Sequence, residues 1–317
     1  SDVAAFVAYT KRAMEIDQDQ AVMVSADKVV VSDFMGNIVP DPKIYTVDWD
    51  ASAAEKGGWD SFMDKEIHED PAAVQRTLLG RLDKDGNLNL DEVRIDEHDF
   101  KAIDKIIVIA CGTAAYAGMV AKYAIEHWVR IPVEVERSHE FRYRDPILTP
   151  RTLVVAISQS GETMDTLMAL RHAREQGSKV LAICNTQGAS IPRESDAVLY
   201  THAGPEVAVA STKAFVAQIT AAYVLGLYLA QIKGAMFRDE IQQTLDSLKD
   251  MPRKIQWVLD TQTKAVHDAA AQMVDAKSFL FLGRHVGYPV AMEGALKLKE
   301  IAYTFTEGFA AGELKHG

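Results

Sequence analysis

The sequence predicts an α/β protein in which helices cover both faces of a parallel β-sheet. Three observations support this fold class. Short runs of aliphatic and β-branched residues recur along the middle of the chain, amphipathic segments of helical length separate them, and glycine or hydroxyl-bearing residues stand where a strand passes into a helix. The strand runs are apolar throughout, as expected for strands that are buried on both faces. We therefore expect right-handed βαβ units.

Composition narrows the possible ligands. The formal net charge of −11 disfavours nucleic acid and anionic membranes as partners, because both carry negative charge. No uninterrupted apolar run approaches the roughly 20 residues of a membrane span. The most hydrophobic predicted helix, Ala214–Ile232, is interrupted by Gln218 and Thr220. We expect a cytoplasmic protein with a small-molecule ligand, no nucleic acid and no membrane.

The two cysteines, Cys111 and Cys184, both follow apolar strand runs. This position favours buried, reduced thiols over a disulfide or a pair of metal ligands. We accordingly predict no metal site.

The N-terminal part of the chain has a different pattern. Alternating runs at Ala21–Val24 and Val29–Val31, with a turn at 35–37, predict strands and hairpins of a β-rich domain. Small and polar residues at Ala51–Gly58 indicate a domain boundary. A helical segment is expected to follow, from Phe62 to about Leu82.

The segment Asp83–Glu92 resembles a calcium-binding loop in composition but not in register. If Asp83 is the first ligand, Leu88 occupies the position of the turn glycine and Arg94 that of the bidentate glutamate. We therefore predict a turn built from Asp, Asn and Gly.

Strand-to-helix turns in the middle of the chain gather hydroxyl groups. They contain Thr113, the segment Ser158–Thr163, and Ser211. The turns at the carboxyl ends of parallel strands meet at one edge of the sheet, where α/β proteins bind ligands. The predicted strands are Ile106–Ala110, Val133–Glu136, Leu153–Ile157, Val180–Cys184 and Val198–Tyr200.

The segment Ser158–Thr163 is the strongest candidate for binding a phosphate. It opens a helix, whose first N–H groups are free and carry partial positive charge. Ser158, Ser160 and Thr163 offer hydroxyl donors, Gln159 offers an amide, and Gly161 lets the backbone approach a ligand. The alternative is that the serines are ordinary helix N-caps.

The C-terminal part repeats the strand–glycine–helix pattern. A helical segment, Arg238–Ala276, is interrupted at Pro252, and the strand Ser278–Leu282 follows it. A helix beginning at Pro289 then extends to Tyr303. We interpret this repetition as the opening of a second, similar α/β domain.

This last helix carries a candidate catalytic pair. Lys297 and Glu300 lie one helical turn apart and could form an imine with a ketone and move a proton on the adjacent carbon. The alternative is an exposed ion pair between Glu293 and Lys297. His316 lies in a glycine-flanked loop and is either an acid–base group or a solvated side chain.

Six segments together resemble the glutamine–fructose-6-phosphate aminotransferase family. They are ACGTAAYAGMVAKY (110–123), EFRYRD (140–145), SQSGETMDTL (158–167), VASTKAF (209–215), EGALKLKEIAY (293–303) and AAGELKHG (310–317). The resemblance implies a sugar isomerase (SIS) domain of Rossmann-like topology. The preceding residues would be the end of an α+β glutaminase domain, and those after it the start of a second SIS domain. The implied divisions are 1–55 (glutaminase), 56–100 (linker), 101–236 (first SIS domain), 237–276 (connector) and 277–317 (second SIS domain).

The resemblance also implies roles for individual residues. Lys297 would form the imine, Glu300 would move the proton between C1 and C2, and His316 would assist ring opening from the neighbouring subunit of a homodimer. The substrates would be fructose 6-phosphate and glutamine-derived ammonia, without a cofactor. Ala114 replaces a serine of many relatives and offers only its backbone N–H. The residues implied to hold the sugar phosphate are Thr113, Ser158, Gln159, Ser160, Thr163 and Ser211.

Two other functions fit parts of the pattern. A phosphosugar isomerase or fructosamine-phosphate deglycase would keep the phosphate loop and the lysine–glutamate helix but lack a glutaminase domain, which residues 1–49 argue against. A sugar-phosphate sensor would need neither Lys297, Glu300 nor His316. We also expect the sequence to be a piece of a longer protein, unable to hydrolyse glutamine or complete the synthesis alone.

Overall fold

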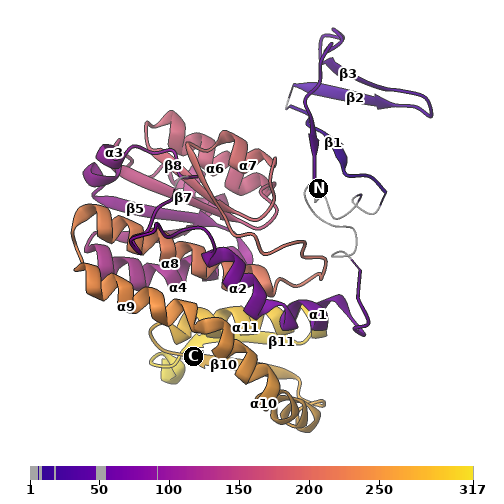
Figure 1. Cartoon of the computed structure of the whole chain (residues 1–317). Helices are drawn as coiled ribbons and strands as arrows, with labels where there is room; N and C mark the ends of the chain where they lie inside the picture. The colour runs from indigo at the N-terminus through magenta and orange to yellow at the C-terminus, as the bar shows by residue number, and fades with distance from the viewer. Residues whose placement is uncertain (1–5, 7–8, 18, 48–54, 91, 317) are drawn as a thin grey trace.

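A five-stranded parallel sheet organises the protein (Figure 1). The computed structural model describes residues 6, 9–17, 19–47, 55–90 and 92–316. The strand order is β6-β5-β7-β8-β9, and all four neighbouring pairs are parallel. The predicted parallel α/β fold is therefore confirmed. The strands are β5 (Lys105–Ala110), β6 (Val133–Arg137), β7 (Thr152–Ser158), β8 (Lys179–Cys184) and β9 (Ala197–Tyr200).

The strand order reverses between β5 and β7. From β5 the chain first adds β6 on one side and then β7, β8 and β9 on the other. At such a reversal the loops at the carboxyl ends of the two strands lead to opposite faces of the sheet and leave a crevice between them. The segments that follow β5 and β7 contain Thr113 and Ser158–Thr163, so both lie at this crevice.

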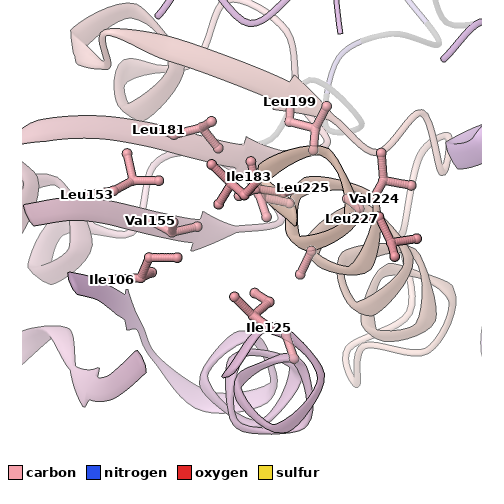
Figure 2. Close-up of a cluster of buried hydrophobic side chains, with 14 of the residues drawn as sticks. Ile106, Ile125, Leu153, Val155, Leu181, Ile183, Leu199, Val224, Leu225 and Leu227 are labelled. Carbon is pink, nitrogen blue, oxygen red and sulfur yellow. The ribbon is translucent and has the colours of Figure 1, made fainter. Parts of the chain in front are cut away.

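Helices cover both faces of the sheet, and alternate residues of each strand contribute to two separate cores. In β7, Leu153, Val155 and Ile157 belong to one core, while Val154 and Ala156 belong to the other. Figure 2 shows Leu153, Val155, Leu181 and Ile183 facing side chains of the helices α4 (Gly112–Val129) and α8 (Lys213–Lys233). The opposite face is covered by α5 (Ser138–Arg144), α6 (Met164–Glu175) and α7 (Ser190–Glu194).

Helix α8 is the most apolar helix and lies in the core. By length and composition this helix could cross a membrane. However, 61% of its apolar stretch is buried inside the protein. A Cβ at Gly226 would lie 2.8 Å from Ile125 Cγ1 and 3.3 Å from Trp128 Cε3, which shows how closely α8 packs against α4. Contacts within the protein therefore account for the apolar composition of this helix.

The N-terminal strands form two antiparallel pairs, as predicted. Strand β1 (Arg12–Met14) pairs with β4 (Ile44–Thr46), and β2 (Gln20–Val24) pairs with β3 (Val29–Asp33). Figure 1 shows β2 and β3 standing apart from the large sheet. Residues 51–54 of the predicted domain boundary lie outside the described residues.

Three short helices connect this part to the sheet. The predicted helical segment is divided into α1 (Phe62–His68) and α2 (Asp70–Leu78), and α3 (Glu97–Ala102), which was not predicted, precedes β5. The predicted turn between α2 and α3 is confirmed. There the Asp83 carboxylate accepts hydrogen bonds from the backbone N–H groups of Asp85 and Asn87.

The C-terminal part contains one further βαβ unit. Helices α9 (Arg238–Lys249) and α10 (Met251–Gln272) meet just before Pro252, as predicted. Strands β10 (Ser278–Gly283) and β11 (Phe305–Ala310) are parallel, and α11 (Gly287–Ala302) connects them and packs against α4. The assignment of these segments to separate domains stays a prediction.

Acidic side chains in α1 and at the junction of α1 and α2 hold the segment that leads into α8. Glu66 Oε1 accepts hydrogen bonds from the backbone N–H groups of Val207 (2.6 Å) and Ala208 (3.1 Å), and Lys213 pairs with Glu69. Asp70 lies in the same cluster, and its Oδ1 is buried without a hydrogen-bond partner among the described residues. Burial and the nearby Glu206 raise the pKa of Asp70 to about 7.

The raised pKa of Asp70 predicts that the variant Asp70→Asn is stabilised at pH 8. The pKa of Asp70 is 3.8 in the unfolded chain and about 7 in the folded protein. Between pH 3.8 and about pH 7, the folded protein therefore keeps a proton on Asp70 that the unfolded chain has released. Stability is therefore lost as pH rises through this window. We expect the variant to melt higher by roughly 2–4 °C at pH 8, corresponding to about 1 kcal/mol, with little difference at pH 4. Melting curves of the two proteins from pH 4 to pH 8 measure this difference. Asp60→Asn is the control, because Asp60 is exposed. An equal change in melting temperature at pH 4 and pH 8 would contradict the raised pKa of Asp70.

Candidate active site

The loop between β7 and α6 is shaped by its own hydroxyl groups. Ser158 Oγ accepts a hydrogen bond from the Gly161 backbone N–H (3.0 Å) and lies 3.1 Å from Thr163 Oγ1. Ser160 Oγ accepts from the Glu162 backbone N–H at 3.2 Å. The structure therefore brings three of the predicted phosphate-binding hydroxyls into one loop.

The N-cap residue of α6 is Thr163, and its side chain makes no capping hydrogen bond. The alternative interpretation of Ser158 and Ser160 as N-caps is therefore wrong. Gln159 fixes the other side of the loop, because its carbonyl oxygen accepts a hydrogen bond from the Asn185 backbone N–H. Free N–H groups and several hydroxyls at a helix N-terminus are suited to an anion.

Gly161 is required by the shape of this loop. Its φ is +70°, in the left-handed region that favours glycine. A Cβ at this position would lie 2.6 Å from Ala189 Cβ and 3.1 Å from Pro192 Cδ. The Gly161 carbonyl also accepts a hydrogen bond from the Ile191 backbone N–H, so the loop rests directly on α7.

Thr113 lies at the start of α4, at the neighbouring strand end, and contacts the predicted catalytic lysine. Its Oγ1 accepts a hydrogen bond from Lys297 Nζ (2.9 Å) and donates to Glu293 Oε1 (3.0 Å). The adjacent Ala114 is buried in the core and offers no side-chain hydroxyl. Thr113 therefore connects the edge of the large sheet to α11.

Lys297 Nζ lies between two carboxylates of its own helix. Glu300 Oε2 is 2.7 Å away and Glu293 Oε1 is 3.4 Å away, so the predicted lysine–glutamate pair is formed. The alternative, a Glu293–Lys297 ion pair, is also formed, but it is not an exposed pair, because Glu293 is only 5% exposed. Residues 293, 297 and 300 share one helical face. Glu293 is buried where this face packs against α4, Lys297 is half-buried, and Glu300 is exposed at its end.

Glu293 is the functional candidate that sequence reasoning missed. Burial raises its pKa to about 7, although the charge of Lys297 and the hydrogen bond from Thr113 act in the opposite direction. Its Oε2 is buried without a hydrogen-bond partner among the described residues. A carboxyl group with such a pKa can take up or release a proton near neutral pH. The sequence did contain a signal for Glu293, because positions 293, 297 and 300 are spaced to lie on one face of a helix.

Two predicted site residues lie away from this group. Ser211 Oγ donates to Glu206 Oε2 (3.0 Å), and Glu206 Oε1 also accepts from the backbone N–H groups of Thr212 and Ala214. A carboxylate of the chain itself therefore occupies the N-terminus of α8. His316 is exposed in the 3-10 helix Leu314–His316, and no contact with Lys297 is found among the described residues. The roles of both residues stay predictions.

The two cysteines differ in exposure. Both are free, but only Cys184 is buried, and burial raises the pKa of its thiol above the usual range. Cys111 is half-buried at the end of β5. The prediction of two buried thiols is therefore wrong for Cys111, because the helix that follows β5 leaves its side chain at the open edge of the sheet.

Comparisons with known proteins agree with this geometry. Residues 100–228 match the family of SIS domains. The chain is 67% identical over 317 residues to glutamine–fructose-6-phosphate aminotransferase (isomerizing) of Corynebacterium efficiens, and 58% identical over 321 residues to that of Mycobacterium tuberculosis. In both cases the alignment covers all of this chain and 51% of the relative, so the chain spans about half the length of these relatives.

Solved structures show the same similarity. The C-terminal domain of glucosamine-fructose-6-phosphate aminotransferase from Francisella tularensis superposes with a TM-score of 0.79 and 41% identity, over 83% of this chain and 73% of that one. Glucosamine-6-phosphate deaminase from Thermotoga maritima has a TM-score of 0.64 at 21% identity, over 81% of this chain and 72% of that one. At that identity the second match shows the fold alone.

Proposed function

The chain belongs to the family of glutamine–fructose-6-phosphate aminotransferases, and from this membership we propose that it carries the sugar-phosphate part of their reaction. The full-length protein would convert fructose 6-phosphate and glutamine into glucosamine 6-phosphate and glutamate. The observation that carries the proposal is the position of Lys297 Nζ, which is held by Thr113, Glu293 and Glu300 at the edge of the sheet that presents the hydroxyl loop.

The loop Ser158–Thr163 binds the phosphate group in this proposal, with Thr113 and Ser211 contributing from the neighbouring turns. Free N–H groups at the start of α6 and the hydroxyls of Ser158, Ser160 and Thr163 supply neutral donors, and the Gln159 amide orients the sugar. A net negative protein can hold a phosphate in this way because the donors and the helix dipole act locally.

Lys297 and its two carboxylates perform the chemistry at C1 and C2. Lys297 passes a proton to a neighbouring carboxylate, and the neutral amine adds to the C2 ketone with loss of water to form an imine. Ammonia then displaces the lysine amine from C2. Glu300 takes a proton from C1 of the protonated imine and returns one to C2, while the C1 hydroxyl releases its proton to solvent and becomes the aldehyde of the 2-amino aldose. The buried Glu293, with a pKa of about 7, accepts and returns the proton of Lys297.

The proposal extends to a cytoplasmic homodimer. His316 is exposed and apart from Lys297, which fits a role in opening the sugar ring in the active site of a second copy. Ammonia would come from glutamine hydrolysed by a domain to which residues 1–55 belong. The two free cysteines fit a reducing compartment.

Isotope transfer in the full-length protein tests the proposed function. The protein is incubated with fructose 6-phosphate and glutamine labelled at the amide nitrogen, and the products are identified by mass spectrometry. Labelled glucosamine 6-phosphate is expected. Sugar-phosphate isomerisation without incorporation of nitrogen would instead indicate a phosphosugar isomerase, and binding without any product would indicate a sensor.

Removal of the Ser158 hydroxyl is expected to weaken binding of the sugar phosphate. Ser158→Ala deletes the acceptor of the Gly161 N–H and one phosphate donor. We expect affinity for fructose 6-phosphate to fall by about 10-fold, the effect of roughly 1.4 kcal/mol. Isothermal titration of this chain measures the change. The control, Ser195→Ala, removes a hydroxyl whose partner among the described residues is the Ile191 carbonyl in α7. Unchanged affinity in Ser158→Ala would remove Ser158 from the phosphate site.

A further inference from the structure

Three potential metal ligands meet beside the phosphate loop. They are the thiol of Cys111, the imidazole of His139 and the carboxylate of Asp165, and one ligand atom from each lies within 4.8 Å of the other two. Cys111 follows β5, His139 lies at the start of α5 after β6, and Asp165 lies in the first turn of α6 after β7. Because β6, β5 and β7 are adjacent in the sheet, their carboxyl ends bring these distant residues together.

A chain of buried hydroxyl groups fixes the three segments relative to one another. The fully buried Thr166 donates from Oγ1 to Cys111 Sγ (3.9 Å) and lies 2.9 Å from Ser138 Oγ. Thr166 directly follows Asp165, and Ser138 directly precedes His139. The contact between Thr166 and Ser138 therefore joins the segments that carry Asp165 and His139, and the hydrogen bond from Thr166 orients the Cys111 thiol. Such a supporting shell is what orients ligands in metal sites.

The ligands are accessible from solvent and can adjust to a metal ion. Cys111 is half-buried, whereas His139 and Asp165 are exposed. Bond lengths of about 2.0–2.3 Å place tetrahedral zinc ligands roughly 3.3–3.8 Å apart, so the ligand atoms, which lie within 4.8 Å of one another, need to approach by at most about 1.5 Å. Rotation of the two exposed side chains can supply this movement. Among the described residues, the Glu140 carboxylate competes weakly for His139, because it is exposed and lies 3.7 Å from His139 Nε2.

We propose that Cys111, His139 and Asp165 form a binding site for Zn²⁺ or a similar borderline transition-metal ion. The combination of sulfur, nitrogen and oxygen donors favours such a cation over Mg²⁺ or Ca²⁺, which prefer oxygen alone. Three protein ligands leave one tetrahedral position for water. Binding displaces the thiol proton of Cys111 to solvent and forms a metal–thiolate bond. Asp165 lies two residues beyond Thr163, so the bound ion would lie next to the phosphate loop.

Cobalt substitution tests this site directly. Tag-free chain is titrated with Co²⁺ in the presence of a reductant that contains no thiol, and absorption is followed in the near ultraviolet. The expected result is one Co²⁺ per chain with a thiolate-to-cobalt charge-transfer band, which one equivalent of Zn²⁺ abolishes by displacement. Absence of the band would overturn the proposal.

Matched variants assign the ligands. Cys111→Ser is expected to remove the band, whereas His139→Ala and Asp165→Asn should each weaken Co²⁺ binding by at least about 10-fold. The double variant His98→Ala/Asp99→Asn is the control. It deletes another exposed His–Asp pair, 3.8 Å apart, and should leave binding unchanged. A band that persists in Cys111→Ser, or unchanged affinity in His139→Ala, would overturn the assignment. Thermal melts verify that each variant is folded.

Discussion

Replacing Lys297 by methionine is expected to lower the formation of glucosamine 6-phosphate by the full-length protein by on the order of 10³-fold or more, because the reaction loses its nucleophile. Methionine keeps the length of the side chain, and binding of fructose 6-phosphate should change by less than about 10-fold, since the phosphate contacts lie on another loop. Turnover by coupled assay and affinity by titration separate the two effects. Lys299→Met is the control, because Lys299 lies exposed on the same helix.

Chemical trapping tests whether Lys297 acts as the nucleophile. Borohydride reduction in the presence of fructose 6-phosphate should add the sugar to the peptide that contains Lys297, as seen by mass spectrometry. An adduct on a different lysine would contradict the imine assignment and leave Lys297 a role in proton transfer only. Full activity of Lys297→Met would exclude both roles.

The variant Gly161→Ala is expected to lose affinity for the sugar phosphate by more than about 10-fold, together with about 1–3 kcal/mol of stability. The added Cβ meets Ala189 Cβ at 2.6 Å, and the φ of +70° disfavours any residue with a Cβ. The loop must move away from α7, and the Gly161 N–H then leaves Ser158. Titration with fructose 6-phosphate and thermal melts measure the two changes.

Gly177→Ala separates the two causes of this effect. Gly177 lies just beyond the C-terminus of α6, and its φ is +85°. A Cβ at this position meets nothing within 4 Å. The variant should therefore lose only about 1 kcal/mol of stability and bind the sugar phosphate normally. If both variants lose the same affinity, the contact between Gly161 and α7 does not control the phosphate loop.

The sequence predicted the sheet and the position of its hydroxyl-rich loop well because the relevant signals are local. The apolar runs that become β5, β7 and β8 and the hydroxyls of Ser158–Thr163 are each contained in a few consecutive residues. Helix α3 was missed because six residues are too few for a periodic pattern. The family resemblance supplied the roles of individual residues, which the spacing alone left open.

Most of the features that sequence reasoning missed depend on contacts between distant segments, whereas the contact of Ser211 with Glu206 is local. The burial of Glu293 results from the packing of α11 on α4, and the engagement of Ser211 results from the folding of Glu206 onto the start of α8. The meeting of Cys111, His139 and Asp165 depends on the order of the strands, which no local pattern in the sequence encodes. Most polar side chains in proteins are exposed, so a polar residue in a sequence is expected to face solvent. The tertiary structure is needed to identify the polar side chains that are buried.

The hydrogen bond between Thr113 and Lys297 joins residues 184 positions apart and so bears on the order in which the protein folds. Each βαβ unit of the large sheet closes a much shorter loop, and loops that bring distant residues together are slower to close. The sheet and the Ser158–Thr163 loop can therefore form while α11 is still undocked. In the proposed function, a folding chain would acquire the loop that binds phosphate first and the Lys297 amine last, so the nucleophile would not be assembled before its substrate pocket exists.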